Sequence, residues 1–306
     1  MEQNQGIGAL TMSANEKANH FEQSRTRLLG LSYRILGSVA DAEDAVQDTY
    51  LKWARQDPNK IDNSEAWLTR VCTRHCLDIM RSSHKSRVDY IGTWLPEPIQ
   101  TSTNCEFSDN TELACSLTTA FLLMLERLTP KERAAYLLRE IFDTPYEQIA
   151  ETLKLQEANC RKLVSRAKLN IDKDKVRNTT PLTAQKQFLN AFQSAVTDGN
   201  TEPLMHLLSD DVRLDADGGG KVATIKKSLN GKAAVMEFLG RNLHQYWANH
   251  DWQSLDINGS RGIVISLENV TTAIVSFSFD SRQRVTGIYI MRNPEKMNLL
   301  SKAPIH

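Results

Sequence analysis

The N-terminal part of the chain places apolar residues at helical spacing between polar ones. Five of them fall on one side of a segment that begins near residue 17: Leu28, Leu29, Leu31, Ile35 and Leu36. This spacing predicts a helix that Gly37 ends. Ser38 is then the expected cap of a second helix, which stops at Asp57-Pro58-Asn59. A third helix is predicted over residues 64–82, so this part of the chain is expected to be all-helical.

A second helical pattern follows a polar, proline-containing segment. Thr129-Pro130 and Thr144-Pro145 both begin a capping-box pattern with proline at the first helical position. Two helices are therefore predicted to begin at these points. The second is short, ends near Leu153, and is followed by a turn and another helix that reaches Leu169. This arrangement is typical of a helix-turn-helix.

After Pro181 the pattern changes to helices followed by alternating, strand-like segments. Helices are predicted at residues 183–198, 201–208 and 232–246. Strands are predicted at residues 212–216, 221–225, 252–258, 263–267, 271–279 and 285–291. This order predicts a multi-domain protein in which two all-α helical domains precede an α+β domain with a curved antiparallel sheet. The expected boundaries are 1–16 (disordered), 17–85 (first helical domain), 86–112 (linker), 113–175 (second helical domain) and 182–300 (α+β domain).

Composition narrows the function classes. The 306 residues are 41% hydrophobic and 24% charged, which excludes a collagen, a coiled-coil rod and a wholly disordered chain. The chain has no run of 18 apolar residues and no basic-apolar leader, so a cytoplasmic protein is predicted. Five cysteines without an export signal indicate reduced thiols. Because Cys72 and Cys76 lack the second pair of ligands that zinc needs, no metal and no cofactor are expected.

Net charge is zero, with 37 basic and 37 acidic side chains, but the charges are segregated along the chain. Residues 154–177 carry eight bases and three acids, as expected for a helix that enters the major groove of DNA. Residues 41–65 carry a net charge of −4, and residues 66–87 carry +4. An acidic helix beside a basic one indicates two surfaces, one for a basic protein partner and one for a nucleic-acid backbone.

The motifs themselves resemble a known family. Asp41-Ala-Glu-Asp44-Ala-Val-Gln47-Asp48, then Ala66-Trp67-Leu68-Thr69-Arg70, then the helix-turn-helix, are similar to regions 2 and 4 of bacterial extracytoplasmic-function (ECF) sigma factors. Residues 94–98, 217–221 and 293–296 look like the signature motifs of the subgroup that carries a C-terminal SnoaL-like (NTF2-like) domain. Glu295 and Met297 stand where that subgroup more usually has Asp and Leu.

The resemblance implies a role for each motif. The acidic helix would dock on the β′ clamp of RNA polymerase core: Asp41, Glu43, Asp44, Gln47 and Asp48. The −10 promoter element would be opened and bound by Trp67, Arg70, Arg74 and Arg81. The −35 element would be read by Glu157, Asn159, Arg161, Lys162, Ser165 and Arg166, with the other face of that helix on the β flap. The C-terminal domain would act as an in-chain regulator held by Trp94, Leu95, Pro96, Glu97, Pro98, Asp217, Gly218, Gly219, Gly220, Lys221, Asn293, Pro294, Glu295 and Lys296.

Other interpretations stay open at this point. Trp67 fits an aromatic core position equally well, and the Asp217 to Gly220 segment also fits a plain hairpin turn. The chain as a whole could be a helix-turn-helix regulator that acts without polymerase, although the acidic helix argues against this. It could also be a SnoaL-like enzyme, or could bind a small ligand in its C-terminal domain. Candidate acid-base groups there are Asp215, Asp217, His206, His244, His250 and Asp251, but no pair can be placed in one pocket, so an enzyme is not predicted.

Overall fold

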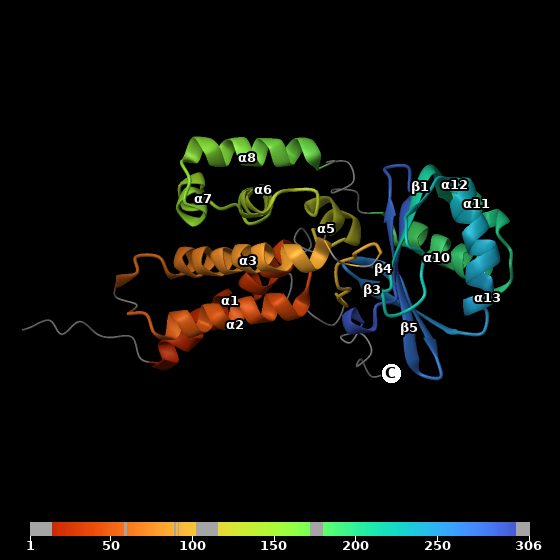
Figure 1. Cartoon of the computed structure of the whole chain (residues 1–306), viewed down its shortest axis with the longest axis horizontal. Coiled ribbons are helices and arrows are strands. Elements are labelled where there is room, and N and C mark those ends of the chain that lie inside the picture. Colours follow the sequence, from red (N-terminus) through yellow and green to blue (C-terminus); the bar gives the residue numbers. More distant parts are fainter. Residues whose placement is uncertain are drawn as a thin grey trace, which may run out of the picture.

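A computed structural model describes residues 14–57, 60–88, 90, 92–101, 116–171 and 180–297. The described chain forms a helical half and a half built from one sheet and its covering helices, which lie side by side (Figure 1). The segment predicted to be disordered, residues 1–16, lies outside the described residues except for its last three, which belong to the first helix, and of the predicted linker, residues 86–112, the structure describes 86–88, 90 and 92–101.

The first three helices pack against one another. They are α1 (Ala14–Leu36), α2 (Val39–Ala54) and α3 (Ser64–Val88). The predicted boundary between α1 and α2 is confirmed, because Gly37 has a φ of 69° and the Ser38 hydroxyl accepts a hydrogen bond from the third residue of α2. Helix α3 continues six residues beyond its predicted end.

The second helical segment contains α5 (Thr119–Leu125), α6 (Pro130–Tyr136), a π-helical turn η3 (Leu137–Ile141), α7 (Tyr146–Leu153) and α8 (Glu157–Asn170). The capping box at Thr129 is confirmed. The one predicted at Thr144 is wrong, since Pro145 is the N-cap and α7 begins one residue later. The π-helical turn draws Thr144 inward, where its amide donates to Leu138 and its hydroxyl is buried without a hydrogen-bond partner among the described residues.

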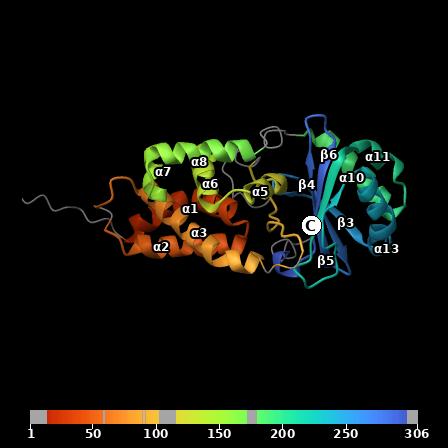
Figure 2. The same cartoon turned by 45° about the horizontal axis from the view of Figure 1, so that its top comes forward.

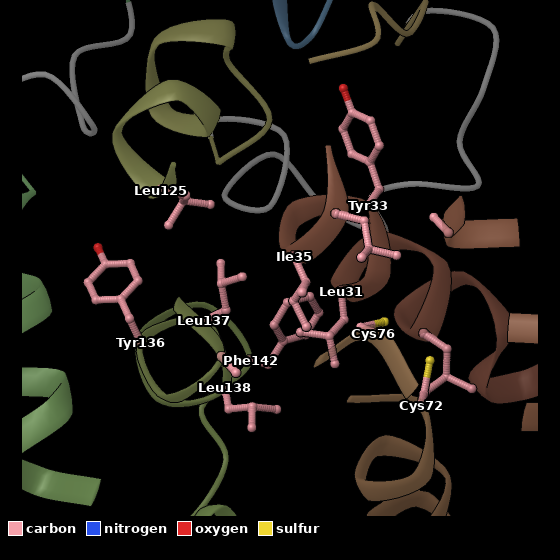
Figure 3. Close-up of a cluster of buried hydrophobic side chains, with 14 of the residues drawn as sticks. Leu31, Tyr33, Ile35, Cys72, Cys76, Leu125, Tyr136, Leu137, Leu138 and Phe142 are labelled. Atoms are coloured by element: carbon pink, nitrogen blue, oxygen red, sulfur yellow. The ribbon is translucent and has the colours of Figure 1, made fainter. Parts of the chain in front are cut away.

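One hydrophobic core joins the two helical segments. Leu31 and Ile35 of α1 lie in it together with Leu137 and Leu138 of η3 and Leu125 of α5 (Figure 3). Two arginines are buried at this contact. Arg34 donates to the Ser116 hydroxyl at 2.9 Å, and Arg133 donates to the Ile35 carbonyl at 2.7 Å. The two segments therefore lie tightly together in this structure.

The sheet has six strands in the order β2-β1-β6-β5-β4-β3. They are β1 (Leu208–Asp217), β2 (Leu229–Asn230), β3 (Asp251–Ile257), β4 (Ser260–Leu267), β5 (Val270–Phe279) and β6 (Val285–Met291). The expectation of a wholly antiparallel sheet is wrong, because β1 and β6 pair in parallel. These two strands lie far apart in sequence, so no hairpin constrains their direction.

The strand predicted at residues 221–225 is also wrong. The amides of Lys221 and Val222 donate to the Gly218 carbonyl, which closes a tight turn, and the two-residue strand β2 pairs with β1 instead. Because these two amides donate within the turn, they cannot also donate to a neighbouring strand.

The two faces of the sheet have different partners. One face is covered by α10 (Leu182–Thr197), α11 (Glu202–Leu207), α12 (Lys232–Glu237), the π-helical turn η4 (Phe238–Leu243) and α13 (His244–Trp247). The other face turns toward the helical half (Figure 2). On this face, sheet residues that include Val264 and Ile274 form an apolar cluster with Leu95, which lies outside the sheet. Ala120 and Leu123 of α5 pack against that cluster. Both faces of the central strands are therefore covered, the second face at the junction between the halves.

Candidate functional site

The acidic residues of α2 lie on the face opposite its buried residues. Helix α2 buries Ala42, Ala45, Val46, Thr49 and Trp53, which leaves the intervening carboxylates on the outside. Glu43, Asp44 and Gln47 are exposed, and Asp41 and Asp48 are half-buried. Glu43 and Gln47 also line a cavity of about 440 Å³ between α1 and α2, whose apolar walls include Phe21. The result is an acidic ridge next to a cavity with both apolar and charged walls.

The basic face of α3 contacts the helix-turn-helix. Arg70 forms an ion pair with Glu151, near the end of α7. Arg74 donates to the backbone carbonyls of Thr152 at 2.9 Å and Glu151 at 2.6 Å. Burial at this contact and the neighbouring Arg70 lower the pKa of Arg74. Two of the four predicted −10 residues are therefore occupied by the second helical segment.

The other two −10 candidates differ from each other. Trp67 is half-buried, and its ring centroid lies 5.6 Å from that of Trp53 on α2. Arg81 is exposed and pairs with Asp78 one turn away. Trp67 thus packs at the edge of the core with part of its surface still accessible.

Helices α7 and α8 form the predicted helix-turn-helix. Lys154 ends α7 with a left-handed φ of 52°, and Ile149, Leu153, Cys160, Val164 and Ala167 are buried between the helices and the core. All six predicted −35 residues are exposed: Glu157, Asn159, Arg161, Lys162, Ser165 and Arg166. Arg161 pairs with Glu157 at 3.0 Å and lies over the Tyr146 ring at 4.2 Å. The outer face of α8 is free to meet another macromolecule.

Five residues from three segments meet at the junction of the two halves, and we call them the clasp: Tyr90, Leu95, Asp217, Asn293 and Lys296. Asp217 is fully buried at the end of β1. One carboxylate oxygen accepts from the Tyr90 hydroxyl at 2.5 Å, and the other accepts from the Leu95 amide at 2.9 Å and the Lys296 ammonium at 2.8 Å. The charge of Asp217 is thereby compensated inside the protein.

Lys296 completes the clasp from the C-terminal side. Its ammonium also donates to the Leu95 carbonyl at 2.7 Å and lies 4.4 Å from the centre of the Trp94 ring. The Asn293 amide donates to the Tyr90 hydroxyl at 3.0 Å. Burial and the adjacent Asp217 carboxylate raise the pKa of Tyr90. The tyrosine is therefore held as a neutral hydrogen-bond donor.

Two glycines make these contacts possible. Gly219 has a φ of 61°, and a Cβ at this position would lie 2.4 Å from the Asn293 amide nitrogen. A Cβ on Gly37 would lie 2.5 Å from the Trp94 ring. A side chain at position 219 would therefore displace Asn293 of the clasp, and one at position 37 would displace the Trp94 ring that faces Lys296. Beyond the clasp, Lys221 and Glu295 of the signature motifs form an ion pair at the surface.

Glu97 makes a second set of contacts at the junction. Its carboxylate accepts from the Val39 amide at 2.7 Å, at the N-terminus of α2, and its backbone amide donates to the Gly37 carbonyl at 2.9 Å. The Tyr33 hydroxyl donates to the Glu97 carbonyl at 2.5 Å and accepts from the Asn258 amide at 2.8 Å. Pro96 and Pro98 are buried on either side of it. Residues 94–98 thus tie the first helical segment to the sheet.

Sequence reasoning missed three residues of this junction: Tyr33, Tyr90 and Asn258. Asn258 has a φ of 50° and precedes a glycine, which is the ordinary signature of a hairpin turn. That signature hides its second role, since its side chain bonds Tyr33, the Leu117 carbonyl and the Ile99 amide. No local pattern marks the two tyrosines.

Three of the candidate acid-base groups, Asp215, Asp217 and His244, each have another partner in the described chain. Asp217 belongs to the clasp, and buried Asp215 pairs with Arg213 at 2.7 Å. His244 contacts the Val196 carbonyl through Nδ1 at 2.7 Å. In the part of the chain that the structure describes, no cluster of His, Cys, Asp or Glu side chains could hold a metal ion. No helix among the described residues is long and apolar enough to cross a membrane.

An acidic helix, a basic tryptophan-bearing helix and a helix-turn-helix, in this order, define the class of RNA polymerase sigma factors. Family models for sigma-70 region 2 and sigma-70 region 4 match residues 20–86 and 118–171. The ECF RNA polymerase sigma factor SigJ of Mycobacterium tuberculosis is 34% identical over 225 residues, which are 73% of this chain and 72% of SigJ. The chain belongs to the ECF RNA polymerase sigma factors.

Two further comparisons extend over nearly the whole chain. The probable ECF RNA polymerase sigma factor SigI of Mycobacterium tuberculosis is 25% identical over 280 residues, covering 90% of this chain and 93% of SigI. The crystal structure of Mycobacterium tuberculosis SigJ matches with a TM-score of 0.72 at 28% identity, over 92% of this chain and 98% of that chain. The predicted fold class, two helical domains followed by a SnoaL-like helix-plus-sheet domain, is confirmed.

Proposed function

We propose that this sigma factor docks its acidic α2 ridge on the β′ clamp of RNA polymerase core and reads the −10 and −35 elements with α3 and α8. The exposure of the ridge and of the six polar residues on α8 supports these assignments. The C-terminal domain acts as an in-chain regulator that controls whether the two helical segments are available to polymerase and promoter.

The clasp is the observation that carries the regulatory part of this proposal. The buried Asp217 carboxylate accepts from Tyr90 and Leu95 of one segment and from Lys296 of another, and this contact is costly to break, because any partner removed leaves a charge or a donor uncompensated in a low-dielectric site. The clasp therefore favours one placement of the sheet against the helical half. It leaves the SnoaL-like domain attached to the residues that join regions 2 and 4.

The contact between α3 and α7 keeps two proposed DNA-binding arginines away from promoter DNA. Arg70 and Arg74 cannot bind promoter phosphates while they bind Glu151 and Thr152. The two promoter elements also lie on separate stretches of DNA, so α3 and α8 must move apart to reach both. Core polymerase and promoter would shift the population from this closed arrangement to an open one.

The test is binding of the full chain to purified bacterial RNA polymerase core. The double charge reversal Glu43→Lys/Asp44→Lys, at two exposed acids of α2, is expected to abolish binding, because the β′ partner surface is proposed to be basic. Glu202→Lys/Glu237→Lys, which reverses two exposed acids on the C-terminal domain, is the matched control and is expected to leave binding unchanged. Equal binding by both double variants would refute the docking assignment.

A second variant separates docking from regulation. Lys296→Met opens the clasp without touching α2, and it is expected to bind core more tightly than the unaltered chain. An unchanged affinity of this variant for core polymerase would refute the regulatory role. It would not affect the docking assignment, which the charge reversals test separately.

A further inference from the structure

The SnoaL-like domain contains a cavity of about 320 Å³ on the side of the sheet that faces away from the helical half. Ala216 and Ile290 line it from β1 and β6, and Phe238 and Trp247 line it from η4 and α13. Residues 223–225, in the loop that follows the glycine turn, also line it. Its size lies at the lower end of the range for small-molecule pockets.

One cation lines this apolar cavity. Arg292 directly follows β6, and its Nη1 donates to the Ala223 carbonyl at 2.6 Å. Its Nε is buried and has no hydrogen-bond partner among the described residues. The Arg292 side chain is half-buried, and this burial lowers its pKa. A buried donor without an acceptor costs free energy that a suitable ligand would recover.

We propose that this cavity binds a small apolar carboxylic acid as its anion, with the carboxylate on Arg292 and the apolar part against Phe238 and Trp247. A guanidinium presents parallel N–H groups that match the two oxygens of a carboxylate. The aromatic side chains supply the apolar surface that the rest of such a ligand needs. Larger or strongly polar anions fit neither the volume nor the walls.

The lining also indicates binding rather than turnover. Its polar members are Thr224, Asn242, Tyr246 and Arg292, and the cavity has no carboxylate or imidazole among its lining residues. General acid-base catalysis needs such groups within hydrogen-bond reach of the substrate. None of the acid-base candidates identified from the sequence lines this cavity.

The cavity adjoins the clasp. The Arg292 amide donates to the Asp217 carbonyl at 2.7 Å, and the loop of residues 223–225 continues from the Gly218–Lys221 turn. A ligand would therefore touch the segments that lead into two clasp residues, Asp217 and Asn293. Control of the clasp by such a ligand rests on the function proposed above, whereas binding itself does not.

Titration calorimetry on the full chain at neutral pH, without polymerase, tests the binding. Each of two acids, 2-naphthoate and octanoate, is compared with its neutral amide, which has nearly the same shape. We expect at least one acid to bind about tenfold or more tightly than its amide, as a hydrogen bond to a charged group allows. No binding by either acid, or equal binding of acid and amide, would overturn the proposal.

Variants locate the site. Arg292→Gln is expected to remove the preference for the acid, and Arg292→Lys to keep it with weaker affinity. Arg241→Gln is the matched control, because Arg241 lies on η4 beside the lining residue Asn242 but is exposed and paired with Glu237. A preference for the acid that survives in Arg292→Gln, or disappears in Arg241→Gln, would contradict the assignment to this cavity. If Arg292→Gln does not fold, the comparison of acid with amide still tests whether the anion binds, and the Arg292→Lys variant still tests whether it binds at Arg292.

Discussion

The Lys296 ammonium donates to the Asp217 carboxylate at 2.8 Å, and the two residues are 79 positions apart in the chain. Both side chains are almost completely removed from solvent, at 11% and 0% exposure. The same ammonium also holds the Leu95 carbonyl and faces the Trp94 ring. One ion pair therefore joins the three signature motifs of the junction.

Asp217→Asn should lower the free energy of unfolding by about 3–5 kcal/mol, because it leaves a buried ammonium without its counter-charge. The double variant Asp217→Asn/Lys296→Met contains neither charge, so no uncompensated charge is buried in it. Its loss of unfolding free energy should therefore be smaller than the sum of the losses in the two single variants. Urea unfolding of all four proteins measures this coupling. Strictly additive losses would show that the two charges do not depend on each other.

Gly219→Ala should destabilise the junction more than an ordinary glycine replacement in the left-handed region. Gly199 is the matched control, because its φ is 72° and an added Cβ would meet nothing within 4 Å. Gly199→Ala therefore reports backbone strain alone, whereas Gly219→Ala adds the collision with Asn293. Thermal unfolding should show a clearly lower Tm for Gly219→Ala. Equal Tm values for the two variants would mean that Asn293 moves aside freely.

Local chemistry made much of the fold predictable. Ser38 and Thr129 form the caps expected of them, since a cap depends only on residues within one helical turn. Thr144 shows the limit of the same reasoning. Its pattern matches a capping box, but the preceding π-helical turn buries it, and that turn depends on packing that the pattern does not contain.

The junction was predictable only through the family resemblance. Residues 94–98, 217–221 and 293–296 meet in space, yet nothing in their spacing requires it. Tyr90 and Asn258 show why: each acts through side-chain hydrogen bonds to residues more than 100 positions away in the chain. Long-range contacts of this kind leave no periodic signal in the sequence, whereas strand alternation does.

Glu97 should make stability depend on pH. Burial raises the pKa of this carboxyl above its ordinary value, although the Val39 amide partly opposes the shift. At pH values between the unfolded and the folded pKa, Glu97 is therefore still protonated in the folded chain but already ionised in the unfolded chain. This contribution to stability is complete below the unfolded pKa and is lost as the pH rises through the folded pKa.

Replacing Glu97 with Gln should remove that loss, since the amide oxygen can still accept from Val39. The stability of Glu97→Gln relative to the unaltered chain should thus increase as the pH rises from about 4.3, the ordinary glutamate value. Urea unfolding at half-unit intervals measures it, with the exposed Glu268→Gln as control. A stability difference that stays constant with pH would rule out Glu97 as the titrating group.

Glu151→Arg should open the contact between α3 and α7. Glu151 pairs with Arg70 at the surface, and such pairs contribute only about 0–1 kcal/mol, but the reversal adds repulsion from Arg70 and Arg74. Glu147→Arg lies one turn earlier on the same helix, is also exposed, and is the matched control. Fluorophores placed at Lys52 and Lys162 through unnatural amino acids report the separation of α2 and α8 by energy transfer.

The expected result is a larger population with long separation in Glu151→Arg than in Glu147→Arg or the unaltered chain. Binding of a single-stranded −10 oligonucleotide should increase in parallel, because Arg70 and Arg74 become available to phosphates. Identical separations in the two variants would mean that the buried core shared by the helical segments, and not this ion pair, holds them closed. In that case opening would have to come from polymerase itself.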